Sequence, residues 1–305
     1  MRIQQTVRQI IFILILILVA SGLRFLVVKL FAEPTLAEKN APIFEEKNYQ
    51  STNIYIYNLT DEEEIYSKNA QEQRAPASLT KLMTSTVALE NISDYSQSAP
   101  VLNDIYQEMV RENASMAGFD PGEKTTYNDL LYGILLPSGG ECAGSMAVHV
   151  GGTTGDFVRR MNEEAEKLGL VNSFFNNPVG LDREGHYTCA QDIAMIFKRA
   201  LSFDKFRRVI STSSIRSSKT SSHPGGLLLE SNLLKELPKY SQEGFKIIGG
   251  KSGTTYNAGL CLVTLAEKNG KEIITVVMGY PFENISDPGD GDIVETLDIL
   301  KSLEI

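Results

Sequence analysis

Strand-like patterns at both ends of the chain enclose a helical middle, and this order constrains the fold more than any other feature of the sequence. The two apolar runs near the C-terminal end are separated by Asn269-Gly270, the dipeptide most typical of a tight hairpin turn. The expected strands cover residues 53–57, 64–67, 245–248, 260–266 and 272–278. Strands from both ends that share one core predict a single discontinuous domain around an antiparallel sheet.

The middle of the chain carries apolar residues at helical spacing. Asn128 is the expected cap of the second helix, and Gly169 closes the fourth. The expected helices cover residues 78–89, 128–137, 141–149, 154–168, 191–201 and 291–303. We therefore predict an α/β domain over residues 51–305, with a helical insertion at roughly 90–240.

Within the first expected helix, Ser78 and Lys81 lie three residues apart and so share one face. A hydroxyl becomes a nucleophile when a neighbouring base takes its proton, and an amine serves as that base when burial or another cation lowers its pKa. The pair is thus a candidate nucleophile and base. One Ser-x-x-Lys is weak evidence, because a capping Ser followed by a solvated Lys gives the same pattern, and a second copy occurs at Ser202 and Lys205.

Two downstream elements strengthen the catalytic interpretation. They are Ser138-Gly139-Gly140 and Lys251-Ser252-Gly253-Thr254-Thr255. Ser-x-x-Lys, a Ser-x-Asn-like element and Lys-Ser/Thr-Gly, in this order, are the signature of penicillin-binding proteins and serine β-lactamases. The chain resembles the low-molecular-weight D-alanyl-D-alanine carboxypeptidases, serine peptidases that trim the terminal D-Ala from peptidoglycan stem peptides. The likeness runs from residue 53 to residue 280 and includes segments 177–182, 184–188, 231–234 and 258–263.

The resemblance implies a DD-peptidase/β-lactamase-like fold, with an antiparallel sheet flanked by helices and an active site in the cleft beside the inserted helical subdomain. By the same resemblance, Ser78 would attack the carbonyl of the penultimate D-Ala and form an acyl-enzyme, with Lys81 as the base. Backbone N–H groups of Ser78 and Thr254 would form the oxyanion hole. Water would then release the shortened peptide.

Three further residues complete the site that the resemblance implies. Ser138 and Lys251 would relay a proton to the leaving amine, and Lys251 and Thr255 would meet the terminal carboxylate of the substrate. Lys251 is also expected to help keep Lys81 neutral. The implied substrate is a stem peptide ending in D-Ala-D-Ala, the implied acylating inhibitors are β-lactams, and no metal or organic cofactor is expected.

Gly140 departs from the Ser-Gly-Asn that is usual in this family, where the Asn side chain helps to hold the substrate and the catalytic Lys. Two alternatives stay open, and only the second draws its support from Gly140. One is a transpeptidase or β-lactamase of the same fold, although the chain lacks the Glu-x-x-Leu-Asn element that would favour rapid penicillin hydrolysis. The other is a membrane-anchored protein that binds penicillin or D-Ala-D-Ala with little turnover.

Residues 1–32 differ in kind from the rest of the chain. Arg2 and Arg8 precede an apolar run at residues 10–23, which Arg24 interrupts. A run of this length with basic residues before it is typical of an export signal or a membrane anchor. Both interpretations place the domain outside the cytoplasm.

The two interpretations differ in whether the segment is retained. Residues 20–22 form a small-x-small cleavage site, whereas an anchor would extend to Phe31 with its basic residues at the interface. The chain stops at Ile305 without the C-terminal amphipathic anchor that the family often carries, which favours retention. Residues 33–50 are the expected linker to the domain.

Charge and composition argue against several other chemistries. A formal net charge of −9, a pI near 5.0 and the lack of a basic patch argue against nucleic acid as a partner. Cys142, Cys189 and Cys261 have neither metal-ligand spacing nor a paired framework, so we expect small buried hydrophobes. Glu141, beside the second motif, is expected to be a solvated helix-start carboxylate, with an extra acid in the cleft as the alternative. His186 is expected to be structural, since no Gly-x-Ser-x-Gly elbow surrounds either candidate serine.

Overall fold

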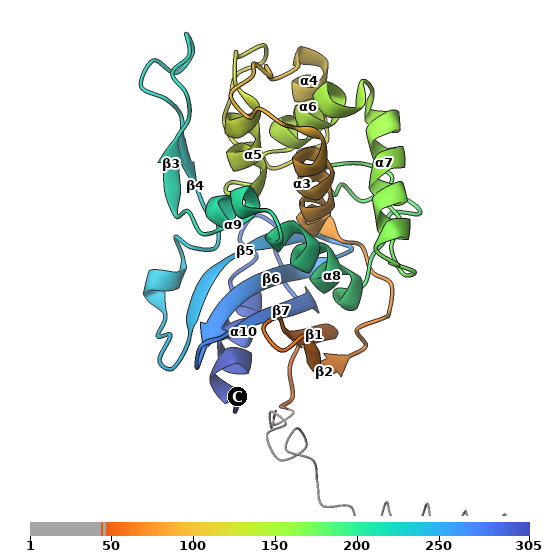
Figure 1. The fold of residues 1–305 in the computed structure, drawn as a ribbon, viewed down its shortest axis with the longest axis vertical. Helices are drawn as coiled ribbons and strands as arrows, with labels where there is room; N and C mark the ends of the chain where they lie inside the picture. Colours follow the sequence, from red (N-terminus) through yellow and green to blue (C-terminus); the bar gives the residue numbers. More distant parts are fainter. Residues whose placement is uncertain (1–43, 45–46) are drawn as a thin grey trace, which may run out of the picture. The chain divides into compact units, whose positions relative to one another are not determined.

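A five-stranded antiparallel sheet forms one layer of the domain, and the helical segments pack against it (Figure 1). The computed structural model describes residue 44 and residues 47–305, of which Phe44–Glu304 form one unit. The strand order is β2-β1-β7-β6-β5, so the N-terminal hairpin pairs with strands from the C-terminal end. The strands are β1 (Asn53–Asn58), β2 (Glu63–Lys68), β5 (Lys246–Thr255), β6 (Gly259–Lys268) and β7 (Lys271–Tyr280). The predicted discontinuous α/β fold is confirmed.

The pairing of β6 with β7 follows from the turn that joins them. Asn269 and Gly270 have φ angles of 49° and 78°, the left-handed conformation that a tight two-residue hairpin turn requires and that these residue types tolerate. β7 then pairs along the whole length of β1, whose six residues are all buried. The turn thus sets the pairing of β6 with β7, and β1 joins the sheet by long-range pairing with β7.

Both faces of β7 are covered. Ile274, Val276 and Met278 belong to the main hydrophobic core, on the side where α8 packs against β1 and β7. The alternate residues Ile273 and Val277 are equally buried and point to the other face, where α10 packs against β6 and β7. A strand that is covered on both faces explains a run of apolar residues without polar alternation.

The helical part of the chain lies between β2 and β5, as the sequence predicts, and is completed by one C-terminal helix (Figure 1). Helices α4 and α9 and a small antiparallel hairpin were not assigned from the sequence. The helices are α3 (Thr80–Asn91), α4 (Asn103–Arg111), α5 (Tyr127–Leu135), α6 (Gly140–Gly151), α7 (Thr154–Lys167), α8 (Ala190–Leu201), α9 (Asp204–Ile210) and α10 (Gly291–Ser302). The hairpin is β3 (Ser214–Arg216) with β4 (Leu228–Glu230), and the short 3-10 turns are η1 (Ala77–Leu79) and η2 (Leu237–Lys239).

Two helix starts differ from the predictions. The cap of α5 is Thr126 and not Asn128, because Thr126 and Asp129 form a reciprocal capping box in which each side chain accepts the backbone N–H of the other. Helix α3 begins at Thr80, two residues later than expected. Ser78 lies in the 3-10 turn before it, since the backbone at Ala77 adopts a left-handed φ of 46°.

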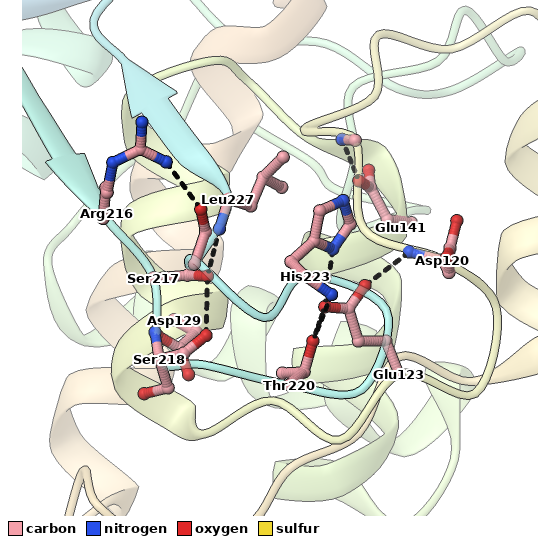
Figure 2. A network of polar contacts seen from close by, with 12 residues as sticks. Asp120, Glu123, Asp129, Glu141, Arg216, Ser217, Ser218, Thr220, His223 and Leu227 are labelled. Atoms are coloured by element: carbon pink, nitrogen blue, oxygen red, sulfur yellow. Dashed lines mark hydrogen bonds and ion pairs between the residues drawn. The ribbon is translucent and has the colours of Figure 1, made fainter.

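A buried polar network fastens the β3–β4 hairpin to the loop between α4 and α5 (Figure 2). The carboxylate of Glu123 is fully buried and accepts hydrogen bonds from the hydroxyl of Thr220 and from Nδ1 of His223, the latter over 2.8 Å. Asp129 accepts the backbone N–H of Ser218 over 2.9 Å. Because buried carboxylates need such partners, the network fixes one loop against the other.

The predicted signal or anchor segment lies outside the described residues. Residues 47–50, which the sequence assigns to the linker, already pack on the domain: Tyr49 is buried, and Gln50 donates its N–H to Glu295 on α10 over 2.6 Å. Within the described part of the chain, no helix combines the length and the apolar character that crossing a bilayer requires.

Candidate active site

Ser78 and Lys81 face each other where η1 meets the start of α3. Lys81 Nζ donates a hydrogen bond to Ser78 Oγ over 3.1 Å. The same amine donates to the carbonyl oxygen of Val179 over 2.7 Å. These two contacts aim the amine at the hydroxyl, which is the geometry that a nucleophile and its base need.

Burial weakens the hold of Lys81 on its proton. The residue is 1% exposed, and the loss of hydration lowers its pKa to about 7, while the charge of Glu141 acts in the opposite direction. Burial and the nearby charge of Lys81 hold the pKa of Lys251 well below its ordinary value. The sequence predicts that Lys251 helps to keep Lys81 neutral. In the structure, the charge of Lys81 lowers the pKa of Lys251, while the pKa of Lys81 is lowered by desolvation.

The loop of residues 177–182 holds the Val179 carbonyl in place. The side-chain oxygen of Asn177 accepts three successive backbone N–H groups of this loop, the shortest over 2.7 Å. Gly180 has a φ of 96°, and a Cβ atom at this position would lie 1.9 Å from the carbonyl oxygen of Ala77. Glycine is therefore required where the loop passes the turn that carries the serine.

Strand β5 also approaches this turn closely. A Cβ atom at Gly253 would lie 2.8 Å from the backbone nitrogen of Ser78, so the glycine of the Lys-Ser-Gly element lets strand and turn come together. Thr254 follows directly on the strand. The backbones that carry the two predicted oxyanion donors are thus in contact, and the oxyanion hole itself stays a prediction.

Ser138 and Lys251 form a second pair of the same kind. Lys251 Nζ donates to Ser138 Oγ over 2.9 Å, and both residues are buried. Ser138 has a φ of 70°, a conformation that is uncommon for a residue with a side chain. Asn232 stabilises the preceding backbone, because its side chain donates to the carbonyl oxygen of Pro137 over 3.2 Å.

A cavity of about 320 Å³ opens at Ser78. Thr255 contributes to its wall, with its hydroxyl donating to Asp182 over 2.9 Å. Within the described structure, neither Ser138 nor Lys251 lines the cavity. Its walls come from three parts of the chain besides Ser78 and Lys81: residues 112–115, residues 179–183, and residues 254–256 with Ile285. The site thus consists of a partly exposed serine beside a buried amine, backed by a second, buried Ser–Lys pair.

Glu141 is buried, and the expectation of a solvated carboxylate is wrong. It is 0% exposed, and one of its oxygens accepts the backbone N–H groups of Ala117 and Gly118 over 2.7 and 3.0 Å (Figure 2). Its other oxygen is buried and has no hydrogen-bond partner among the described residues. The helix start turns inward here, which places this carboxylate close enough to influence Lys81.

The second Ser-x-x-Lys copy and His186 make contacts that do not form a nucleophile and base pair. In the second Ser-x-x-Lys copy, Ser202 bonds to the carbonyl oxygen of Arg199 and Lys205 bonds to Asn128, so the two side chains do not form a pair. His186 accepts the N–H of Asn176 at Nδ1, and its Nε2 lies 2.9 Å from the Thr80 hydroxyl. Burial lowers the pKa of His186 to about 4, which agrees with a neutral structural role.

The three cysteines are buried and unpaired, as predicted. Within the described residues, no group of three or more His, Cys, Asp or Glu side chains is placed to hold a metal ion.

Sequence reasoning missed several residues of the cavity. Val179 and Asp182 belong to a segment that was noted only for its resemblance, although its fixed Asn and Gly positions signal a tightly constrained loop. Glu112 and Arg183 form an ion pair over 2.9 Å, and both line the cavity. Nothing in their local sequence indicates this contact, because it joins positions 71 residues apart (183 minus 112).

Comparison with known proteins finds a family whose model matches most of this chain. A family model described as D-alanyl-D-alanine carboxypeptidase matches residues 42–281. The carboxypeptidase DacF of Bacillus subtilis is 28% identical over 249 residues, covering 82% of this chain and 62% of its own length. The carboxypeptidase of Streptomyces sp. strain K15 is 29% identical, covering 82% of this chain and 87% of its own length. DacA of Escherichia coli is 31% identical, covering 70% of this chain and 52% of its own length.

Solved structures agree with this relationship. The Streptomyces K15 DD-transpeptidase is 27% identical and superposes with a TM-score of 0.73, covering 85% of this chain and 98% of that one. A D-alanyl-D-alanine carboxypeptidase from Mycobacterium tuberculosis, 24% identical, shares the fold with a TM-score of 0.70. The chain thus spans nearly all of the Streptomyces protein and little more than half of several curated relatives.

Proposed function

The chain belongs to the D-alanyl-D-alanine carboxypeptidase family, and on this premise we propose that it removes the terminal D-Ala from peptidoglycan stem peptides through an acyl-enzyme on Ser78. The observation that carries the proposal is the contact of 3.1 Å between Ser78 Oγ and the buried amine of Lys81. A hydroxyl and an amine of lowered pKa at this distance are suited to acyl transfer.

In the proposed acylation, Lys81 takes the proton of Ser78 as the oxygen attacks the carbonyl of the penultimate D-Ala. The negative charge on the carbonyl oxygen would be stabilised by the N–H groups of Ser78 and Thr254. A pKa of about 7 leaves a large fraction of Lys81 neutral near neutral pH, so the base is available without a further partner.

Departure of the terminal D-Ala requires a proton for its amine. Ser138 and Lys251 are joined over 2.9 Å and are the proposed relay. Thr255, which lines the cavity, is the proposed contact for the terminal carboxylate, together with Lys251 behind the wall, whose charged form a bound carboxylate would favour. Thr255 would exchange its hydrogen bond to Asp182 for the substrate, and water would then hydrolyse the acyl-enzyme.

A transpeptidase is the second candidate, because one structural relative carries that name. A groove of about 530 Å³ adjoins the cavity and shares Val179, Leu181 and Arg183 with it, which offers room for an amine acceptor instead of water. β-Lactams would acylate Ser78 in either case. The apolar N-terminal run supports action outside the cytoplasm and, as a proposal, anchoring at the membrane.

The direct test is the release of D-alanine from an N-acylated L-Lys-D-Ala-D-Ala peptide by the full chain. We expect release by the wild type, none by Ser78→Ala, and wild-type release by Ser202→Ala, which alters the second Ser-x-x-Lys copy. Adding a D-amino acid or glycine as acceptor separates hydrolysis from transpeptidation by the products formed. Release that survives Ser78→Ala would refute the assigned nucleophile.

A further inference from the structure

The loop after α4 occupies the space beside Gly140. The N–H of Gly140 donates to the carbonyl oxygen of Ser115 over 2.7 Å. A Cβ atom at position 140 would lie 3.0 Å from Met109 Sδ and 3.2 Å from both Ala114 Cβ and Ser115 O. The absence of a side chain at Gly140 therefore lets residues 112–115 reach the wall of the cavity that holds Ser78 and Lys81.

Asn113 sits at the turn of this loop and lines the cavity. Its φ is 51°, its N–H donates to the carbonyl oxygen of Val110, and the next residue, Ala114, donates to that of Met109. These bonds define a Schellman motif that ends α4, with Asn113 at the left-handed position that glycine usually occupies. The backbone alone therefore does not require the Asn side chain.

The side-chain amide of Asn113 is exposed and has no hydrogen-bond partner among the described residues. The charged groups and Thr255 of the cavity are already paired: Glu112 with Arg183, and Thr255 with Asp182. Asn113 is thus a cavity residue that offers both an N–H donor and a C=O acceptor without breaking an existing contact.

We infer that the Asn113 amide binds the peptide group that precedes the penultimate D-Ala of the acyl donor. This inference rests on the proposed function and names a residue that positions its substrate. A peptide group presents one N–H and one C=O, which a primary amide can match with two hydrogen bonds. The contact lies one residue away from the attacked carbonyl, so it would orient the acyl group over Ser78 without touching the reacting bond.

The test is a double cycle between the side chain and the substrate. Asn113→Gly removes the amide and keeps the left-handed backbone. The matching change in the substrate is an N-acylated L-lysyl-D-lactyl-D-alanine depsipeptide, in which an ester replaces the contacted amide. We expect Asn113→Gly to lower kcat/KM for the all-amide peptide by about tenfold, and for the depsipeptide, which keeps the C=O and lacks the N–H, by only about threefold.

Two controls separate this contact from a general effect on folding. Asn269→Gly makes the same substitution at a left-handed position in the β6–β7 turn, outside the cavity, and should leave kcat/KM unchanged. Asn113→Asp keeps the size and the acceptor for the substrate N–H and loses only the donor to the C=O group, so it should lower kcat/KM on both substrates and keep the preference for the amide. Equal losses on both substrates in Asn113→Gly would overturn the inference and leave the proposed function standing. A wild type that releases no D-alanine and takes up no penicillin would overturn both.

Discussion

Burial and the charge of Glu141 shift the pKa of Lys81 in opposite directions. Burial removes water from its amine and favours the neutral form, while Glu141, itself buried, favours the charged form. Glu141 also fastens residues 117 and 118 to the start of α6, through hydrogen bonds to one of its two oxygens. One side chain thus both fixes the loop that follows the cavity-lining residues 112–115 and influences the charge of the base.

Replacement of Glu141 should therefore change a pH profile. Acylation needs neutral Lys81, so the wild-type rate should rise with pH around a midpoint near the pKa of about 7. Glu141→Gln removes the charge that raises this pKa, so the midpoint should move to lower pH. The measurement is the rate of penicillin acylation against pH, with Glu163→Gln on the exposed face of α7 as the control. An unmoved midpoint would show that Glu141 acts through packing alone.

Gly140→Asn tests the packing of the loop against α6. The new side chain would meet Met109, Ala114 and Ser115, so we expect destabilisation by about 1–3 kcal/mol and slower acylation. Thermal unfolding and the acylation rate measure the two effects. A large rise in peptide hydrolysis at unchanged stability would instead mean that the family's usual Asn is accommodated and that the chain is a weakened enzyme.

At the scale of elements, the site depends on loops held by buried polar groups. Asn177 shapes the loop that presents Val179, Asn232 supports the turn before Ser138, and Glu123 ties the β3–β4 hairpin to the α4–α5 loop. Asn177 acts within its own loop, whereas the other two contacts join separate segments that hydrophobic packing alone would not place to within an ångström.

The Glu123 network makes a prediction for stability. Glu123→Ala leaves the hydroxyl of Thr220, Nδ1 of His223 and the N–H of Asp120 without their acceptor. We expect a loss of about 2–4 kcal/mol in the free energy of unfolding, measured with urea. Glu163→Ala, which breaks an exposed ion pair with Arg159, should cost at most about 1 kcal/mol. Similar losses in the two variants would contradict the role of the network.

Elements with strong local signals could be predicted, and those set by distant contacts could not. The Asn269-Gly270 hairpin and helices α7, α8 and α10 follow from turn chemistry and apolar spacing. The start of α5 was misplaced because Asn128 and Thr126 both suit a cap, and only the reciprocal bond with Asp129 distinguishes them. The burial of Glu141 and the 3-10 turn at Ser78 depend on neighbouring loops, which periodicity does not report.

At the scale of the whole molecule, the sheet draws its strands from both ends of the chain and is covered on both faces. Helix α10 covers one face, while the helical insertion covers the other and carries Ser138. The site lies where η1, α6 and β5 meet, so no part of the sequence forms it alone. Stability and activity should therefore be lost together.

Leu300→Ala tests this coupling from the face of the sheet opposite the main core. Leu300 is 0% exposed, so its truncation should cost about 2–5 kcal/mol. We expect the urea midpoints for circular dichroism and for penicillin labelling of Ser78 to fall together, as in a single cooperative unit. The control is Val294→Ala, at an exposed position of α10. Labelling that persists after the sheet unfolds would contradict a shared cooperative domain.

The central claim is that Ser78 is the acylated nucleophile and Lys81 its base. Intact-mass spectrometry after incubation with benzylpenicillin, followed by peptide mapping, tests it most directly. We predict a single adduct on Ser78, absent in Ser78→Ala, formed far more slowly in Lys81→Met, and unchanged in Ser202→Ala. Surviving penicillin with no adduct on the wild type, or an adduct at another residue, would contradict the account.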